Sequence, residues 1–289
     1  MISAHMLGAS LYIPATHDKL AGTIIGTTSP RARSVIVCTE DSILVTDLQI
    51  ALQRIREILG ELRVYCAGPL RFIRPRNPDV LEELLRMPGI ERIHGFVIPK
   101  ADHRTLPAYL NLLNGTNHLF MPTIETDAAF DTGAMIALRN HLSRAEVRDR
   151  CLAIRIGGND LLRLLGMRRP LDRTIYDTPI GALIPQLVMT FKSRGFNLTG
   201  PVMDQIDSPN LLLDETKRDK LMGLEGKSAI HPCQIDPIES VFRVTTEDLA
   251  VASEVLTNGA PAVFKSGGAM IETVVHRKWA EEVLKKRVT

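Results

Sequence analysis

Eight short apolar runs recur along the chain, and they constrain its fold more than any other feature. Several are rich in Val and Ile, and none alternates apolar with polar residues, which is typical of parallel strands covered on both faces. We therefore predict buried strands at residues 10–14, 34–39, 70–74, 95–99, 118–124, 152–156, 198–203 and 226–230.

Longer amphipathic segments lie between these runs, and we predict helices at residues 47–59, 78–86, 128–141 and 209–222. Asn77 is suited to cap the second of them, because Pro78 follows at the first helical position. The alternation of strands and helices predicts an α/β fold. Eight strands favour a closed (β/α)8 TIM barrel over an open doubly wound sheet, and no GxGxxG motif follows the first strand.

The length of 289 residues suits one barrel of about 250 residues followed by a tail. We predict a barrel domain over residues 1–240 and a C-terminal helical extension over residues 241–289, with one helix at 269–287. The extension would serve as a lid or as an arm that contacts a neighbouring subunit. Residues 166–182 carry few strand or helix signals, and we expect a long loop there.

The composition argues against several classes of function. The net charge is +2 and no run of five Lys or Arg residues occurs, which speaks against a nucleic-acid partner. No stretch of 18 apolar residues and no signal peptide is recognisable, so we expect a cytoplasmic protein without a membrane partner. Four cysteines, Cys38, Cys66, Cys151 and Cys233, show no CxxC spacing and are expected to be reduced thiols.

Charged residues follow the predicted strands at regular intervals. Glu40, Arg74, Lys100, Glu125 and Asp160 are 34, 26, 25 and 35 residues apart. One βα unit of a barrel is about 30 residues long, so these residues would recur once per unit. The carboxyl ends of barrel strands meet at one mouth, where active sites lie. The spacing therefore predicts a functional site at this mouth.

Glu125 and Asp160 would lie on neighbouring strands. Two carboxylates at close range repel each other unless a cation lies between them. Such a pair suits Mg²⁺, which keeps water or substrate oxygens among its roughly six ligands. Gly157 and Gly158 would leave backbone room beside Asp160 for a small substrate. The alternative is that Glu125 only caps a helix that begins near Thr126.

Two cations at the mouth each allow two interpretations. Arg74 could hold a substrate carboxylate or stabilise an enolate, or it could form a structural salt bridge with Glu40 or Asp41. Lys100 could form a Schiff base with the substrate if its pKa were lowered, or it could simply pair with nearby carboxylates.

Several motifs resemble the citrate lyase beta-subunit-like aldolases and lyases. The most specific is the ten-residue stretch Gly226-Lys-Ser-Ala-Ile-His-Pro-Cys-Gln-Ile235. The other matching stretches follow in the family's order over almost the whole chain: Ser10-Leu-Tyr-Ile-Pro14, Thr39-Glu-Asp-Ser42, Arg74 with Asn77, Val97-Ile-Pro-Lys100 and Thr123-Ile-Glu-Thr126.

The resemblance implies a TIM-barrel lyase or aldolase that binds Mg²⁺ through Glu125 and Asp160 and contacts an oxo-acid through Arg74. Members of the family cleave or join 3-hydroxy acids or their CoA thioesters through an enolate, and they form oligomers, often trimers or hexamers. The candidate catalytic residues are Arg74, Glu40, Asp41 and Glu272. The candidate substrate-binding residues are Arg74, Arg76, Lys100, Gly157 and Gly158.

The chain also departs from the family pattern. Gly8-Ala9 and Ala15 stand where many members have an arginine and a glycine, which puts CoA binding in question. The turn after residue 73 is one residue longer, so Arg74 and Arg76 compete for the substrate role. Glu272 replaces the aspartate that reaches a neighbouring subunit in many members.

With these departures, the sequence resembles a divergent branch of the family, the barrel-fold carbon–carbon lyases of bacterial stress and tellurium-resistance gene clusters. The alternative functions are a metal-free Schiff-base aldolase that uses Lys100 and a non-catalytic barrel that binds a metabolite.

Overall fold

A computed structural model describes residues 2–28, 31–62 and 68–287 of the protein. Cys66 lies outside the described residues. The structure contains a barrel of eight parallel strands, as predicted. Their bounds are β1 Gly8–Pro14, β2 Ser34–Cys38, β3 Leu70–Arg74, β4 Gly95–Ile98, β5 Leu119–Ile124, β6 Ile154–Ile156, β7 Leu198–Thr199 and β8 Gly226–Ala229.

The strands follow one another around the barrel in the order β7-β6-β5-β4-β3-β2-β1-β8. Every neighbouring pair is parallel, and β1 pairs with both β2 and β8. A parallel bridge between Gly200 and Lys227 joins the two ends of the row and closes the barrel. The predicted (β/α)8 fold is therefore confirmed.

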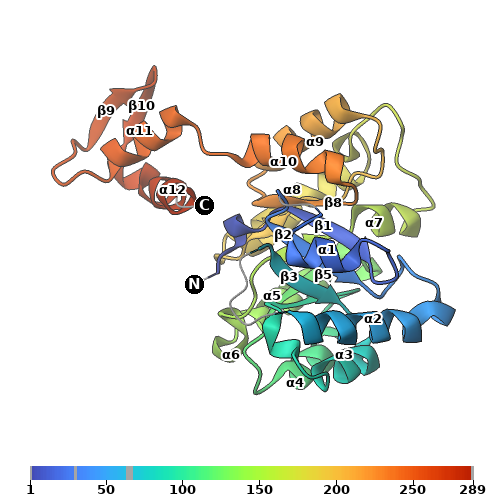
Figure 1. The fold of residues 1–289 in the computed structure, drawn as a ribbon. Coiled ribbons are helices and arrows are strands. Elements are labelled where there is room, and N and C mark those ends of the chain that lie inside the picture. Colours follow the sequence, from blue (N-terminus) through green and yellow to red (C-terminus); the bar gives the residue numbers. More distant parts are fainter. Residues whose placement is uncertain (1, 29–30, 63–67, 288–289) are drawn as a thin grey trace. The chain divides into compact units, whose positions relative to one another are not determined.

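Helices surround the strands on the outside (Figure 1). Their bounds are α1 Leu20–Ile25, α2 Leu48–Glu61, α3 Pro78–Leu85, α4 Leu106–Leu113, α5 Thr132–Leu142, α6 Ala145–Arg148, α7 Gly158–Leu164, α8 Ile180–Lys192, α9 Pro209–Leu221 and α10 Ile235–Phe242. Short 3-10 segments occur at Ala4–Met6, Val45–Asp47, Ile90–Arg92, Asp127–Phe130, Ile175–Asp177 and Pro232–Gln234. Asn77 caps α3 as expected, because its side chain accepts a 2.9 Å hydrogen bond from the amide of Val80.

Several predicted segments differ from the structure. The helix predicted at 128–141 begins only at Thr132, because Asp131 caps it and a 3-10 turn at Asp127–Phe130 precedes it. The loop predicted at 166–182 contains the 3-10 turn Ile175–Asp177 and the first residues of α8. That helix buries an apolar face that includes Ile184, Leu187 and Phe191, which follow the predicted loop, and no helix was predicted there.

The interior of the barrel is packed toward its amino-terminal end. The strands β2, β3, β4 and β5 contribute one apolar side chain each, and residues just before β1 and β6 complete this layer. Its buried members are Ala4, Leu7, Ile36, Phe72, Val97, Met121, Leu152 and Ala153. This end of the barrel is therefore filled with side chains.

The chain divides into two compact units, Met1–Val241 and Phe242–Thr289. The second unit contains α11 Thr246–Val255, the antiparallel strands β9 Val263–Ser266 and β10 Ala269–Glu272, and α12 Thr273–Lys286. Its own small core consists of Ala252, Val255, Ile271, Ala280 and Val283.

The prediction of a single helix at 269–287 is wrong, because residues 269–272 form the second strand of a hairpin. Gly267 and Gly268 form its two-residue turn with φ values of 56° and 81°, which glycine adopts without steric cost. The role of this unit as a lid or a subunit contact stays a prediction. Within the residues that the structure describes, no helix is long and apolar enough to cross a membrane.

Candidate active site

A pocket of about 180 Å³ lies at the carboxyl ends of the barrel strands. Five residues singled out from the sequence line it together: Arg74, Glu125, Gly157, Gly158 and Asp160. They follow or end β3, β5 and β6, so the barrel brings to one place residues that are up to 86 positions apart in the chain. This is the mouth at which a barrel of this type carries its chemistry.

Glu125 is the most deeply buried acid of the pocket, with a side chain that is 1% exposed. Its Oε1 accepts hydrogen bonds from Arg74 Nη2 at 2.8 Å and from the amide of Lys100 at 2.7 Å. Burial raises its pKa to about 7, although the charge of Arg74 and the Lys100 amide oppose this shift. The carboxylate is thus turned toward these two donors, which differs from the capping role considered as an alternative.

Gly157 is required by the close approach of Glu125. A Cβ atom at position 157 would lie 2.5 Å from both Cβ and Oε2 of Glu125. A Cβ atom at position 158 would likewise lie 2.4 Å from Cδ1 of Ile175 and 2.9 Å from Cβ of Pro201. The room that both glycines leave is therefore filled by side chains of the protein itself, although the two residues still line the pocket.

Asp160 lies in the first turn of α7 and also contacts Arg163, at 3.3 Å. Its charge contributes to the raised pKa of Glu125, so the two carboxylates interact across the pocket. Among the described residues no group of three or more His, Cys, Asp or Glu side chains is placed to hold a metal ion. A pair of carboxylates is nevertheless what Mg²⁺ needs from a protein, since water and substrate supply its other oxygens. The donor set fits this ion.

Arg74 connects two acids of the site. It donates to Glu40 Oε2 from Nε at 3.0 Å and from Nη2 at 2.6 Å, in addition to its bond with Glu125. Burial alone would lower the pKa of Arg74, but the charges of Glu125, Tyr12 and Glu40 raise it well above its ordinary value. The guanidinium is therefore a fixed positive charge on the wall of the pocket.

Lys100 adopts a left-handed backbone conformation with a φ of 47°, which is uncommon for a residue other than glycine. Its ammonium group contacts Glu40 and donates to Asp41 Oδ2 at 2.9 Å. Burial would lower the pKa of Lys100, but the hydrogen bonds with Glu40 and Asp41 raise it. Partial burial of Asp41 is likewise outweighed by Lys100, so its pKa is lowered. A lysine held in its charged form is a poor nucleophile, which argues against a Schiff base at this position.

Arg76 points away from the pocket. Its guanidinium donates to the backbone carbonyls of Thr39, Glu40 and Ile43 at 3.1, 2.6 and 2.7 Å. It thereby stabilises the turn that carries Glu40, whereas Arg74 faces the cavity. Glu272, the remaining candidate, is the last residue of β10 in the second unit.

Several polar residues of the pocket were not singled out as site residues from the sequence, among them Tyr12, Thr123, Arg155 and Ser228. Arg155 is the most unexpected, because it lies inside β6 and is only 1% exposed. The signal that could have revealed it is a single charged residue in the middle of the apolar run at 152–156.

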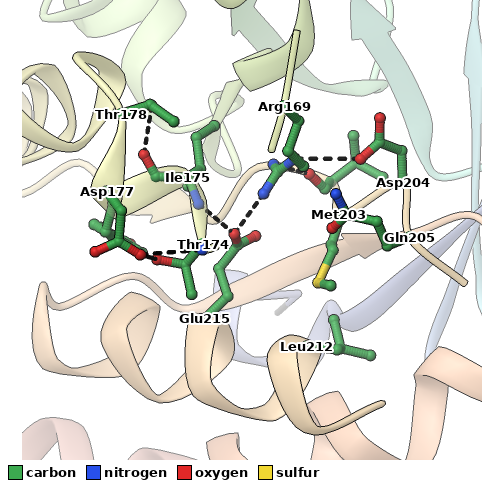
Figure 2. A network of polar contacts seen from close by, with 12 residues as sticks. Arg169, Thr174, Ile175, Asp177, Thr178, Met203, Asp204, Gln205, Leu212 and Glu215 are labelled. Atoms are coloured by element: carbon green, nitrogen blue, oxygen red, sulfur yellow. Dashed lines mark hydrogen bonds and ion pairs between the residues drawn. The ribbon is translucent and has the colours of Figure 1, made fainter. Parts of the chain in front are cut away.

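A buried network of charges supports one wall of the pocket (Figure 2). Arg169 donates to Glu215 Oε2 at 2.5 Å and to the carbonyl of Val202 at 2.6 Å, and the amide of Ile175 donates to the same oxygen of Glu215. Lys227 extends this network, because its Nζ lies 2.8 Å from Glu215 Oε1. Since Val202 lines the pocket, this network fixes the position of the segment that follows β7.

Comparisons with known proteins agree with this geometry. A family described as C–C bond lyases of the TIM-barrel fold matches residues 1–288. A (3S)-malyl-CoA thioesterase of Cereibacter sphaeroides is 22% identical over 253 residues, which cover 86% of this chain and 82% of the relative.

Two solved structures are similar in fold. CitE of Mycobacterium tuberculosis, in complex with magnesium, acetoacetate and coenzyme A, is 20% identical with a TM-score of 0.71, over 99% of this chain and 100% of that one. A citrate lyase of Burkholderia xenovorans LB400 is 14% identical with a TM-score of 0.77, over 97% and 91% of the two chains.

Proposed function

Because the chain belongs to the family of C–C bond lyases of the TIM-barrel fold, we propose that it is a Mg²⁺-dependent lyase or aldolase. Its substrate is a 3-hydroxy acid or the CoA thioester of one, and the bond that is broken or formed lies next to a carboxylate. The printed names of the relatives, a malyl-CoA thioesterase and a CitE bound to magnesium, acetoacetate and coenzyme A, support this choice of substrate and ion.

Glu125 and Asp160 are the proposed Mg²⁺ ligands. When bound, the ion supplies a Lewis acid for a carboxylate and an adjacent oxygen of the substrate. The support from the structure is that burial raises the pKa of Glu125 even beside Arg74, so its charged form is unfavourable in the protein alone. A cation between the two acids would stabilise that charged form.

Arg74 is the proposed stabiliser of the negative charge that develops when the carbon–carbon bond breaks and an enolate forms. Its position is fixed before the substrate arrives, because Glu40 accepts two of its hydrogen bonds. Asp41 has an indirect part, since it holds the ammonium group of Lys100 beside Glu40. Lys100 and the backbone at Gly157 and Gly158 would contact the substrate, while Arg76 holds the turn.

A proton must also move during the reaction. We assign this step to Glu272, whose carboxylate would reach the pocket of a neighbouring chain. The assignment rests on the resemblance of the run Met270-Ile271-Glu272 to the family pattern, and it requires an oligomer.

The observation that carries the proposal is the pair Glu125 and Asp160 in one pocket with Arg74. The test is to measure Mg²⁺ binding by calorimetry and turnover on a panel of 3-hydroxy acids and their CoA thioesters. Glu125→Gln and Asp160→Asn should each weaken Mg²⁺ binding at least about tenfold and reduce turnover about a hundredfold or more. Glu82→Gln, an exposed change in α3, is the matched control and should alter neither. Retention of full metal binding and turnover in Glu125→Gln would refute the proposal.

The metal-free aldolase is distinguished by two measurements. Borohydride reduction in the presence of substrate would trap a covalent adduct on Lys100, and EDTA would leave turnover unchanged. Because Lys100 is paired with Glu40 and Asp41, we expect no adduct and a loss of activity with EDTA.

A further inference from the structure

Arg155 lies at the bottom of the pocket with only neutral partners. Its Nη2 donates to Ser228 Oγ at 2.7 Å and its Nη1 to Ser10 Oγ at 3.3 Å, while its guanidinium carbon lies 5.3 Å from the centre of the Tyr12 ring. Within the described part of the chain, no Asp or Glu forms an ion pair with it, and its Nε has no hydrogen-bond partner.

Two other buried cations of the barrel are paired with acids. Arg74 faces Glu40 and Glu125, and Lys227 faces Glu215 and Asp219. A charge taken out of water without an opposite charge is strongly unfavourable, so proteins pair such groups or use them to bind ions. Arg155 lines the pocket, and the position that a counter-ion would take is therefore open to a ligand.

Neighbouring side chains add further unused hydrogen-bonding capacity. Thr123 of β5 and Thr199 of β7 flank Arg155 in register on either side. The hydroxyl groups of both threonines are buried and have no hydrogen-bond partner among the described residues. Thr123 and Ser228 line the pocket together with Arg155. Hydroxyl groups and a guanidinium that lack an acid make a site suited to a carboxylate.

The bottom of the pocket is one step below the proposed metal site. Thr123 lies in β5 and Glu125 directly follows that strand two residues later, which corresponds to about 7 Å of extended chain, and both line the pocket. An acid whose oxo or hydroxy end lies beside Glu125 and Arg74 would therefore place a short tail against Arg155.

From these contacts we propose that Arg155, with Thr123 and Ser228, binds a second carboxylate of the substrate. This inference rests on the proposed function, because it assumes that the other end of the acid lies at Glu125 and Arg74. The enzyme then acts on a short acid that carries two free carboxylates rather than on a monocarboxylic acid with an apolar tail.

The test compares the binding of two probes that share a 2-oxo acid end, 2-oxoglutarate and 2-oxopentanoate, by calorimetry in the presence of Mg²⁺. The natural chain should bind 2-oxoglutarate at least about tenfold more tightly, because only this probe carries a tail carboxylate for Arg155. Arg155→Met should abolish the preference and keep the affinity for 2-oxopentanoate, and Arg155→Lys should retain part of the preference.

Arg71→Met is the matched control. Arg71 is also a buried arginine, but its Nε donates to the carbonyl of Ile24 and it lines an apolar cavity outside the barrel interior. This variant should keep the preference for 2-oxoglutarate. If Arg155→Met does not fold, as judged by circular dichroism, Ser228→Ala and Arg155→Lys provide the test, and each should reduce the preference.

Two outcomes would overturn the inference: no preference for 2-oxoglutarate in the natural chain, or an undiminished preference in the folded Arg155 variants. Repeating the titrations in EDTA separates this result from the proposed function. A preference that persists in EDTA and depends on Arg155 supports the second carboxylate site by itself, whereas a failure of Mg²⁺ to bind would refute only the metal-dependent reaction.

Discussion

The position of Glu125 depends on the residues that surround its side chain. Its carboxylate receives a backbone amide on one side and Arg74 on the other, and its side chain fills the space that a Cβ at position 157 would occupy. The glycine is therefore needed for the placement of the acid, and the space predicted for a substrate is filled by the side chain of Glu125.

Gly157→Ala should displace Glu125 and weaken Mg²⁺ binding by about tenfold or more, with a loss of about 1–3 kcal/mol in the free energy of unfolding. The control is Gly60→Ala in α2, where nothing lies within 4 Å of the added Cβ. That change should stabilise the protein by up to about 1 kcal/mol without affecting the metal. Normal Mg²⁺ affinity in Gly157→Ala, measured by calorimetry, would contradict this account.

Two histidines lie at the end of the barrel opposite the pocket. Two consecutive strands, β4 and β5, are each preceded by a histidine at the end opposite the pocket. His94 Nδ1 accepts a hydrogen bond from the amide of Arg71 at 2.9 Å, and His118 packs edge-on against Phe96. Burial lowers the pKa of both histidines, more than their hydrogen bonds with the backbone raise it.

These histidines should make the barrel sensitive to acid. Each has a lower pKa in the folded than in the unfolded state, so the unfolded chain binds more protons as the pH falls below about 6.5. Stability that is present at pH 7 is then lost as the pH falls through the folded-state pKa. The urea midpoint should fall between pH 7 and pH 5, and it should fall less in a His94→Asn/His118→Asn double variant. His17→Asn, at an exposed position, should keep the full decrease; an identical decrease in all three proteins would exclude the two histidines as its cause.

The second unit bears on the assembly of the whole molecule. Its hairpin and the start of α12 expose several large apolar side chains: Val263 at 54%, Met270 at 64%, Val274 at 84% and Val275 at 67%. Exposed apolar side chains in such number are characteristic of surfaces that bind another protein. Glu272 lies in the same stretch, which supports the proposal that this unit contributes to the site of a neighbouring chain.

Mixing two inactive variants tests this proposal. Glu125→Gln and Glu272→Ala should each be inactive alone, whereas chains unfolded and refolded together should recover about one quarter of normal activity, because a random oligomer contains that share of intact sites. Light scattering should show a trimer or hexamer. Absence of recovery in refolded mixed oligomers, or a monomer with full activity, would contradict a shared site.

The structural features that could be predicted are those with a periodic signal in the sequence. The barrel follows from eight apolar runs, and the meeting of Arg74, Glu125 and Asp160 follows from one charged residue per βα unit. Features without a periodic signal could not be predicted. Arg155 has no periodic signal, the hairpin depends on the pair Gly267-Gly268, and the bonds of Arg76 to carbonyls depend on tertiary structure. The roles assigned to the site residues stay predictions.

Lys100 has a consequence for how the protein can evolve. A non-glycine residue with a φ of 47° carries a conformational cost of about 1–2 kcal/mol, which glycine would avoid and asparagine would reduce. In a library randomised at this codon, selection for folding alone should enrich glycine and asparagine. Selection for growth on the product should instead retain lysine, because its ammonium group pairs with both Glu40 and Asp41. The two enrichments would measure, at one codon, how far fitness and foldability conflict.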